Sequence, residues 1–152
     1  MKSLTVTSII LLIFFSSCTK EGLDDVDYFA FGSAYGFCQG DCANFFIIRD
    51  DMIYPDDMDY YIETSMKFKS VALPAEKYNL AKNLMDRFPA YLTDRPDQTY
   101  GCPDCADQGG IHIEIKEKGR VMRWHFDTTI ANLPPAIREY VQEISNVIAQ
   151  LE

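Results

Sequence analysis

The fold of this protein is decided by the stretch from Ile111 to Asp127, which reads IHIEIKEKGRVMRWHFD. Apolar and polar residues alternate through both halves, which is the period of a β-strand with one buried face. Lys118 and Gly119 separate the halves and predict the turn of an antiparallel hairpin. The register that gathers the apolar residues on one face pairs Ile115 with Met122, Ile113 with Trp124, and Ile111 with Phe126.

The same register predicts polar pairs on the other face of the hairpin. His112 stands opposite His125, and Glu114 stands opposite Arg123 as a cross-strand ion pair. Cross-strand Cβ atoms lie about 5 Å apart, which would allow two imidazoles to share a zinc or copper ion. Arg123 argues against a cation there, and no third ligand is identifiable. We therefore expect two solvent-facing histidines, with a metal site at His112 and His125 as the alternative.

Four further segments carry strand signals. Tyr28 to Ala34 and Ala43 to Arg49 are rich in bulky apolar residues. Met52 to Tyr54 and Ile62 to Val71 are expected to continue the sheet. Aspartate-rich turn residues lie between the strands, which suits antiparallel connections.

Two helices are expected. Pro74 suits the first turn of a helix whose apolar residues recur at helical spacing up to Phe88, and Pro89 ends that run. Thr93 to Gly110 is rich in Gly and Pro and reads as an irregular loop. After Pro134 and Pro135 comes the most regular amphipathic pattern of the chain, formed by Ile137, Tyr140, Val141, Ile144, Val147, Ile148 and Leu151.

Composition limits the architecture and the partners. The chain has 152 residues, is 47% apolar and carries a formal charge of -9. The length predicts one domain, over 28–152. The expected strands and helices predict an α+β architecture for it, an antiparallel sheet with two helices packed on one face and the C-terminal helix following the β-hairpin. The acidic balance excludes nucleic acid as an expected partner, because phosphate binding needs a surplus of Lys and Arg.

The N-terminus carries an export signal. Lys2 precedes an apolar run from Leu4 to Phe15, too short to span a bilayer, and Ser16-Ser17-Cys18 follows directly. This pattern resembles the lipobox of bacterial lipoproteins. The resemblance implies that residues 1–17 are a cleaved signal peptide and that Cys18 receives diacylglyceryl and acyl chains such as palmitate. It places the protein in the cell envelope, in the outer membrane on its periplasmic or surface face, with the acidic residues 18–27 as a tether.

Four cysteines remain after Cys18. Cys38 and Cys42 are spaced C-x3-C, and Cys102 and Cys105 are spaced C-x2-C. Export favours disulfides, and four cysteines allow three connectivities. A zinc site of four thiolates, or a redox couple at Cys102 and Cys105, are the alternatives.

The motifs around these cysteines are similar to those of an uncharacterised group of small Gram-negative lipoproteins. The similarity covers the C-x-G-x-C turn with Gly40, the Gly101-Cys102-Pro103-Asp104-Cys105-Ala106-Asp107 block, and the order of elements to the C-terminus. Members of the group can carry the first pair alone, which implies pairing within each motif, Cys38 with Cys42 and Cys102 with Cys105. The group has no assigned activity.

Acidic residues gather in the middle of the chain, at Asp50, Asp51, Asp56, Asp57, Asp59 and Glu63. The spaced aspartate loop with a central Gly that binds calcium is absent from this run, so we expect a solvated acidic edge.

The sequence contains no hydrolase, phosphate-binding or dinucleotide motif. The leading hypothesis is a lipid-anchored, non-catalytic envelope module with no cofactor beyond its lipid, which binds the membrane through its anchor and an envelope protein or polymer. The alternative is an extracytoplasmic thiol or zinc protein that uses Cys38, Cys42, Cys102 and Cys105. An enzyme of unrecognised type stays open as a third class.

Overall fold

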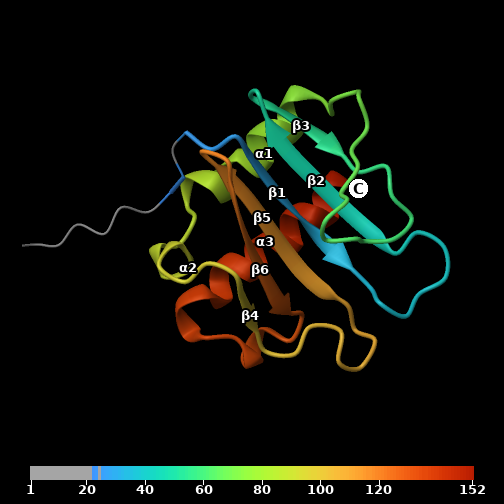
Figure 1. Cartoon of the computed structure of the whole chain (residues 1–152), viewed down its shortest axis with the longest axis vertical. Coiled ribbons are helices and arrows are strands. Elements are labelled where there is room, and N and C mark those ends of the chain that lie inside the picture. The colour runs from blue at the N-terminus through green and yellow to red at the C-terminus, as the bar shows by residue number, and fades with distance from the viewer. Residues whose placement is uncertain (1–21, 24) are drawn as a thin grey trace, which may run out of the picture.

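The structure is a computed structural model that describes residues 22, 23 and 25–152. It is an α+β fold in which helices cover one face of a six-stranded sheet (Figure 1). The strands are β1 (Tyr28–Ala34), β2 (Ala43–Arg49), β3 (Met52–Pro55), β4 (Gln98–Tyr100), β5 (Gly110–Glu117) and β6 (Arg120–Asp127). The helices are α1 (Ala75–Asp86), α2 (Ala90–Thr93) and α3 (Arg138–Leu151), with short 3-10 turns η1 (Ile130–Asn132) and η2 (Pro135–Ile137). The predicted fold class is confirmed.

The strands lie in the order β3-β2-β1-β5-β6-β4. All neighbours are antiparallel except β4, which runs parallel to β6. The hairpin of β5 and β6 has the predicted register, in which Ile115 pairs with Met122, Ile113 with Trp124 and Ile111 with Phe126. The alternating pattern specified this register because a slip by one residue would turn every apolar side chain to the other face.

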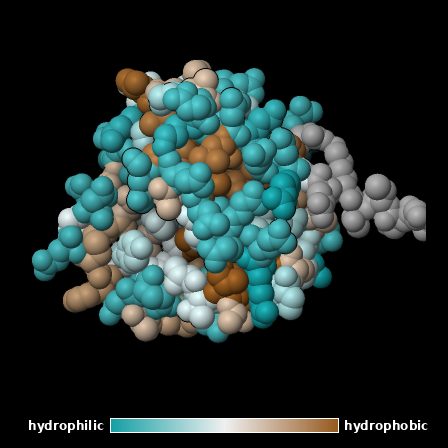
Figure 2. Space-filling view, turned by 180° about the vertical axis from the view of Figure 1, so that it is seen from behind, coloured by the Kyte–Doolittle hydropathy of each residue, from teal (hydrophilic) through white to brown (hydrophobic). Residues whose placement is uncertain are grey.

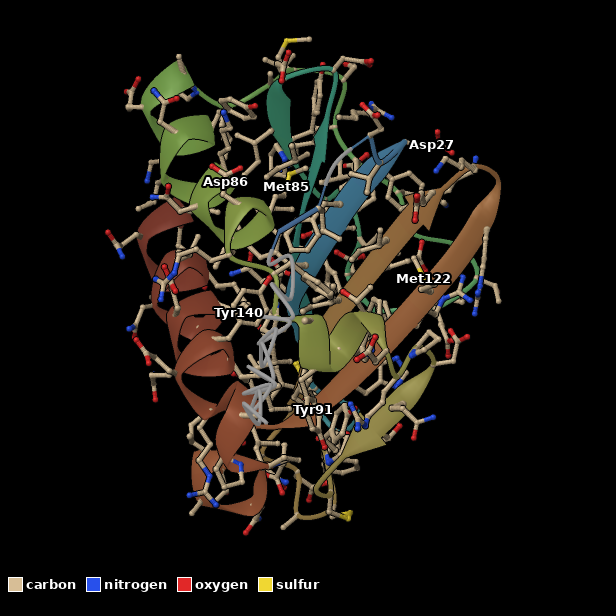
Figure 3. All side chains as sticks on the ribbon, turned by 90° about the vertical axis from the view of Figure 1, so that its left-hand side faces the viewer. Asp27, Met85, Asp86, Tyr91, Met122 and Tyr140 are labelled. Atoms are coloured by element: carbon tan, nitrogen blue, oxygen red, sulfur yellow. A yellow bond between two sulfur atoms is a disulfide. The ribbon has the colours of Figure 1, made fainter. Side chains whose placement is uncertain are left out.

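The main core lies between the sheet and the helices, which Figure 3 shows from the side as two layers. Trp124, Phe29 and Phe31 from the sheet are fully buried there. The predicted apolar stripe of α3 faces the sheet, and its residues from Tyr140 to Leu151 are buried at helical spacing. Figure 2 shows the helical side, where hydrophilic side chains cover most of the surface and apolar surface shows between them.

One strand prediction and one loop prediction need correction. Ile62 to Val71 does not form a strand, and its pairing with the sheet is a single bridge between Phe68 and Asp56. The segment instead crosses the face opposite the helices, where Met66 and Phe68 pack on β1 and β2. Thr93 to Gly110 is not wholly irregular, because it contains β4. Three residues are too few to show a strand period, and β4 forms because β6 offers it a free edge.

The domain contacts begin before Tyr28. The Gly22 amide donates to the Phe88 carbonyl at 3.0 Å, and the Leu23 amide donates to the Met85 carbonyl at 3.0 Å. Leu23 and Val26 pack against the core. These residues of the expected tether are therefore held on the domain, whereas the signal peptide and Cys18 lie outside the described residues. In the part of the chain that the structure describes, no helix has the length and apolar character needed to cross a membrane.

Candidate functional site

An aromatic cluster lies on the sheet face opposite the helices. Gly32 of β1 stands between Phe45 of β2 and His112 of β5 in the sheet register. A Cβ at Gly32 would lie 2.7 Å from the Phe45 Cα, so only glycine leaves space for the rings beside it. Tyr61, from the segment after β3, joins these rings: it stacks on Phe45 with ring centroids 4.6 Å apart and lies 4.6 Å from the His112 ring.

The predicted histidine pair is present, but the two histidines do not face solvent. His112 and His125 are directly paired, with ring centroids 4.7 Å apart and edge to face. Burial, with a further contribution from His125, lowers the pKa of His112 to about 3. Burial also lowers the pKa of His125. The expectation of solvent-facing rings is wrong, because both side chains are half-buried and Tyr61 lies against the His112 ring.

A polar network lies one row further along the same face. Glu114 is 6% exposed, and its carboxylate accepts hydrogen bonds from the Tyr28 hydroxyl at 2.5 Å and from Arg123 Nε at 2.6 Å. This confirms the predicted pairing of Glu114 with Arg123. Arg123 also reaches Glu63 at 3.4 Å, which joins the segment after β3 to the sheet. Burial and the Glu114 carboxylate raise the pKa of Tyr28, so the phenol stays protonated and donates.

A small cavity opens beside His112. Its volume is about 190 Å³, and it is lined by Ala34, Tyr35, Gly36, Tyr60, Tyr61 and His112. The lining comes from β1 and its following loop, from the segment after β3, and from β5, which meet at one end of the sheet (Figure 1). We call this cavity the aromatic pocket. Among the described residues, nothing donates to or accepts from the buried Nδ1 of His112.

Both cysteine pairs form disulfides next to the aromatic pocket. Cys38 is bonded to Cys42, and Cys102 to Cys105, with Cα–Cα distances of 5.7 and 5.5 Å. The predicted disulfides and their local pairing are confirmed. The sulfurs are not thiolates in this state, so zinc binding by these cysteines would first require reduction of both bonds.

Asp104 joins the two disulfide loops. Its carboxylate accepts a hydrogen bond from the Gly36 amide at 2.7 Å and another from the Gly109 amide at 2.9 Å. The first loop is also held to the segment after β3, because the Cys42 amide donates to the Asp59 carbonyl at 2.8 Å. Each disulfide closes its own loop, and these hydrogen bonds hold the two loops to each other and to the segment after β3.

Exposed apolar side chains surround the aromatic pocket. Tyr35 and Phe37 are 46% and 84% exposed, and Tyr60 and Ile62 are 57% and 58% exposed. They form two pairs spaced two residues apart, one between β1 and Cys38 and the other in the segment after β3. Sequence reasoning did not single out these four residues. They could have been found as large apolar residues in otherwise polar segments, where no strand or helix pattern predicts that they are buried.

The acidic run is only partly a solvated edge. The Asp56 carboxylate accepts hydrogen bonds from the Phe45 amide at 2.6 Å and from the Met58 amide at 3.0 Å. Burial nevertheless raises the pKa of Asp56. Asp56 therefore shapes the turn that carries Tyr60 and Tyr61, and the same run lines a second cavity next to the first.

This second cavity, which we call the acidic cavity, has a volume of about 800 Å³. Asp41, Asp57, Asp59 and Glu152 line it, and Tyr35 lines both cavities. In the described ranges, no group of three or more His, Cys, Asp or Glu side chains is arranged to hold a metal ion. The structure thus brings His112 and His125 together without a third ligand.

No protein-family model matches this chain, and no curated protein matches it either.

Proposed function

We propose that this protein is a lipid-anchored binding module of the cell envelope, which binds an envelope protein or polymer without chemical turnover. The observation that carries the binding role is the aromatic pocket, whose lining segments are hydrogen-bonded to two disulfide-closed loops. Binding sites are commonly built on loops that a rigid scaffold positions, and rigid loops lose less entropy when they bind.

The lipobox pattern supports the proposed localisation in the cell envelope. A protein exported to the envelope meets oxidising conditions, and both cysteine pairs are disulfides. A single acyl chain anchors a protein only marginally, so the two or three chains expected at Cys18 would hold it stably on a membrane. The pocket loops lie on the scaffold of the sheet and would face a partner in the envelope.

The lipid anchor and the envelope localisation are tested by metabolic labelling with radioactive palmitate. The full chain should incorporate label and fractionate with membranes, and a Cys18→Ser variant should do neither. Cys38→Ser serves as the matched control, because it removes a different thiol and should leave the label in place. Equal labelling of the Cys18→Ser protein would overturn the lipid anchor.

The binding role is tested by co-sedimentation of the chain with purified envelope polymer and with envelope protein fractions. We use the Cys18→Ser background so that the anchor does not contribute to sedimentation. Tyr60→Ala should reduce the bound fraction at least several-fold, and Val71→Ala should not, although Val71 is 75% exposed. Val71 lines neither cavity. Turnover of a substrate by the purified chain that depends on one polar side chain would contradict a non-catalytic role.

A further inference from the structure

The size of the aromatic pocket indicates what enters it. Sites that bury most of a small ligand have volumes of about 300–1,000 Å³. The aromatic pocket, at about 190 Å³, is smaller. A pocket of this size suits one large side chain inserted from a bigger partner, as anchoring residues do at protein interfaces.

The surroundings of the pocket extend the contact. Phe37 and Ile62 are among the most exposed large apolar side chains of the described residues, and each lies two residues from a pocket tyrosine. Aromatic anchors within a polar rim are typical of the centre of a protein interface. An apolar side chain in the pocket would therefore be flanked by further apolar contacts.

The negative charge next to the aromatic pocket favours a partner of positive charge. The acidic cavity shares Tyr35 with the aromatic pocket and is lined by Asp41, Asp57 and Asp59, while Lys69 is the one basic side chain among its described lining residues. The chain as a whole carries -9. An anionic polymer or a second copy of this chain would be repelled, whereas a cationic segment would be attracted and oriented.

We propose that the occupant is a basic segment of a partner protein, which inserts one large apolar side chain into the aromatic pocket and places Lys or Arg side chains over the acidic cavity. This rests on the proposed binding function and names its partner class. Tyr35 belongs to both halves of the surface, so a single extended peptide segment can reach the two cavities at once.

The test is selection from a library of random peptides displayed on phage, with the full chain as bait. Selected peptides should carry net positive charge and at least one aromatic or large aliphatic residue. Tyr60→Ala should weaken binding of a selected peptide at least tenfold, and Val71→Ala should leave it unchanged. An Asp41→Asn and Asp59→Asn double variant should weaken it and flatten its salt dependence. Circular dichroism melting curves would show that the variants are folded.

Three outcomes decide the proposal. Selected peptides without net positive charge, or peptides whose binding is indifferent to Tyr60→Ala, would overturn the basic partner. Failure of selection together with Tyr60-dependent binding of a neutral oligosaccharide would overturn it too, while the proposed binding function would stand. Failure of both probes to bind in a Tyr60-dependent way would count against both.

Discussion

His112 and His125 face each other across the β5–β6 hairpin with ring centroids 4.7 Å apart. Both side chains are half-buried, and among the described residues neither the buried Nδ1 of His112 nor the buried Nε2 of His125 has a hydrogen-bond partner. Burial makes protonation of either imidazole unfavourable, so the folded protein is most stable when both histidines are neutral. This relationship makes the covered sheet face sensitive to acid.

The first prediction concerns the pH dependence of stability. The pKa of His112 in the folded protein is about 3, below the ordinary histidine value of 6.5. Between these two pH values the unfolded chain therefore binds more protons than the folded protein. The free energy of unfolding should fall as the pH falls from 6.5 towards 3, and the contribution of neutral His112 to stability should be complete above pH 6.5. The slope contributed by one such group approaches about 1.4 kcal/mol per pH unit.

Urea denaturation from pH 7 to pH 4 measures this slope, and His112→Phe removes it. The groups that face the pair are Asp104 and Tyr61 at His112, and Glu63 and Arg123 at His125. All of them are retained in the variant, so the difference between the two curves reports the titration of His112 and its effect on His125. Parallel curves for the parent and His112→Phe would show that His112 is not buried in its neutral form.

The second prediction concerns the buried carboxylate. Glu114→Gln should lower the free energy of unfolding by about 1.5–3 kcal/mol, because charge-assisted bonds to Arg123 and Tyr28 are lost. Glu63→Gln is the matched control: its contact with Arg123 is longer and 47% of its side chain is exposed, so it should cost about 1 kcal/mol or less. Equal losses in the two variants would mean that Glu114 has no special role.

The third prediction compares two tyrosines on the helices. The Tyr140 hydroxyl donates to the Leu84 carbonyl at 2.8 Å inside the core, between α3 and α1 (Figure 3). Tyr140→Phe should cost about 0.5–1.5 kcal/mol in denaturation experiments, because it leaves that carbonyl without its donor. Tyr78→Phe, whose hydroxyl bonds the exposed Asp51, should cost less. The reverse order would contradict the packing of α3 on α1.

The fourth prediction concerns the first disulfide. A Cys38→Ser and Cys42→Ser double variant closes no loop there and should lose about 2 kcal/mol of stability by the chain-entropy relation. Its larger effect should be on binding, since Tyr35 and Phe37 belong to the same β1–β2 connection as the disulfide, and this connection is less rigid without it. Intact mass after alkylation checks the premise. The four cysteines beyond Cys18 should resist alkylation until reductant is added, and labelling without reductant would contradict the disulfides.

The sequence alone determined the β5–β6 hairpin and the last helix. Only one register of the stretch from Ile111 to Asp127 gathers its apolar residues on one face, so the pairing could be derived residue by residue. The same holds for α3, whose apolar stripe repeats over four turns. The hairpin register derived from the sequence also placed Glu114 opposite Arg123 and His112 opposite His125, because cross-strand partners follow from the register.

The tertiary structure decided what covers the second face of the sheet. Tyr61 meets Phe45 and His112 although the three residues come from separate segments of the chain, and no local period encodes such a contact. The aromatic pocket likewise draws its walls from three separated segments. Local patterns report the burial of an element, whereas a site between loops depends on long-range packing that leaves no periodic signal in the chain.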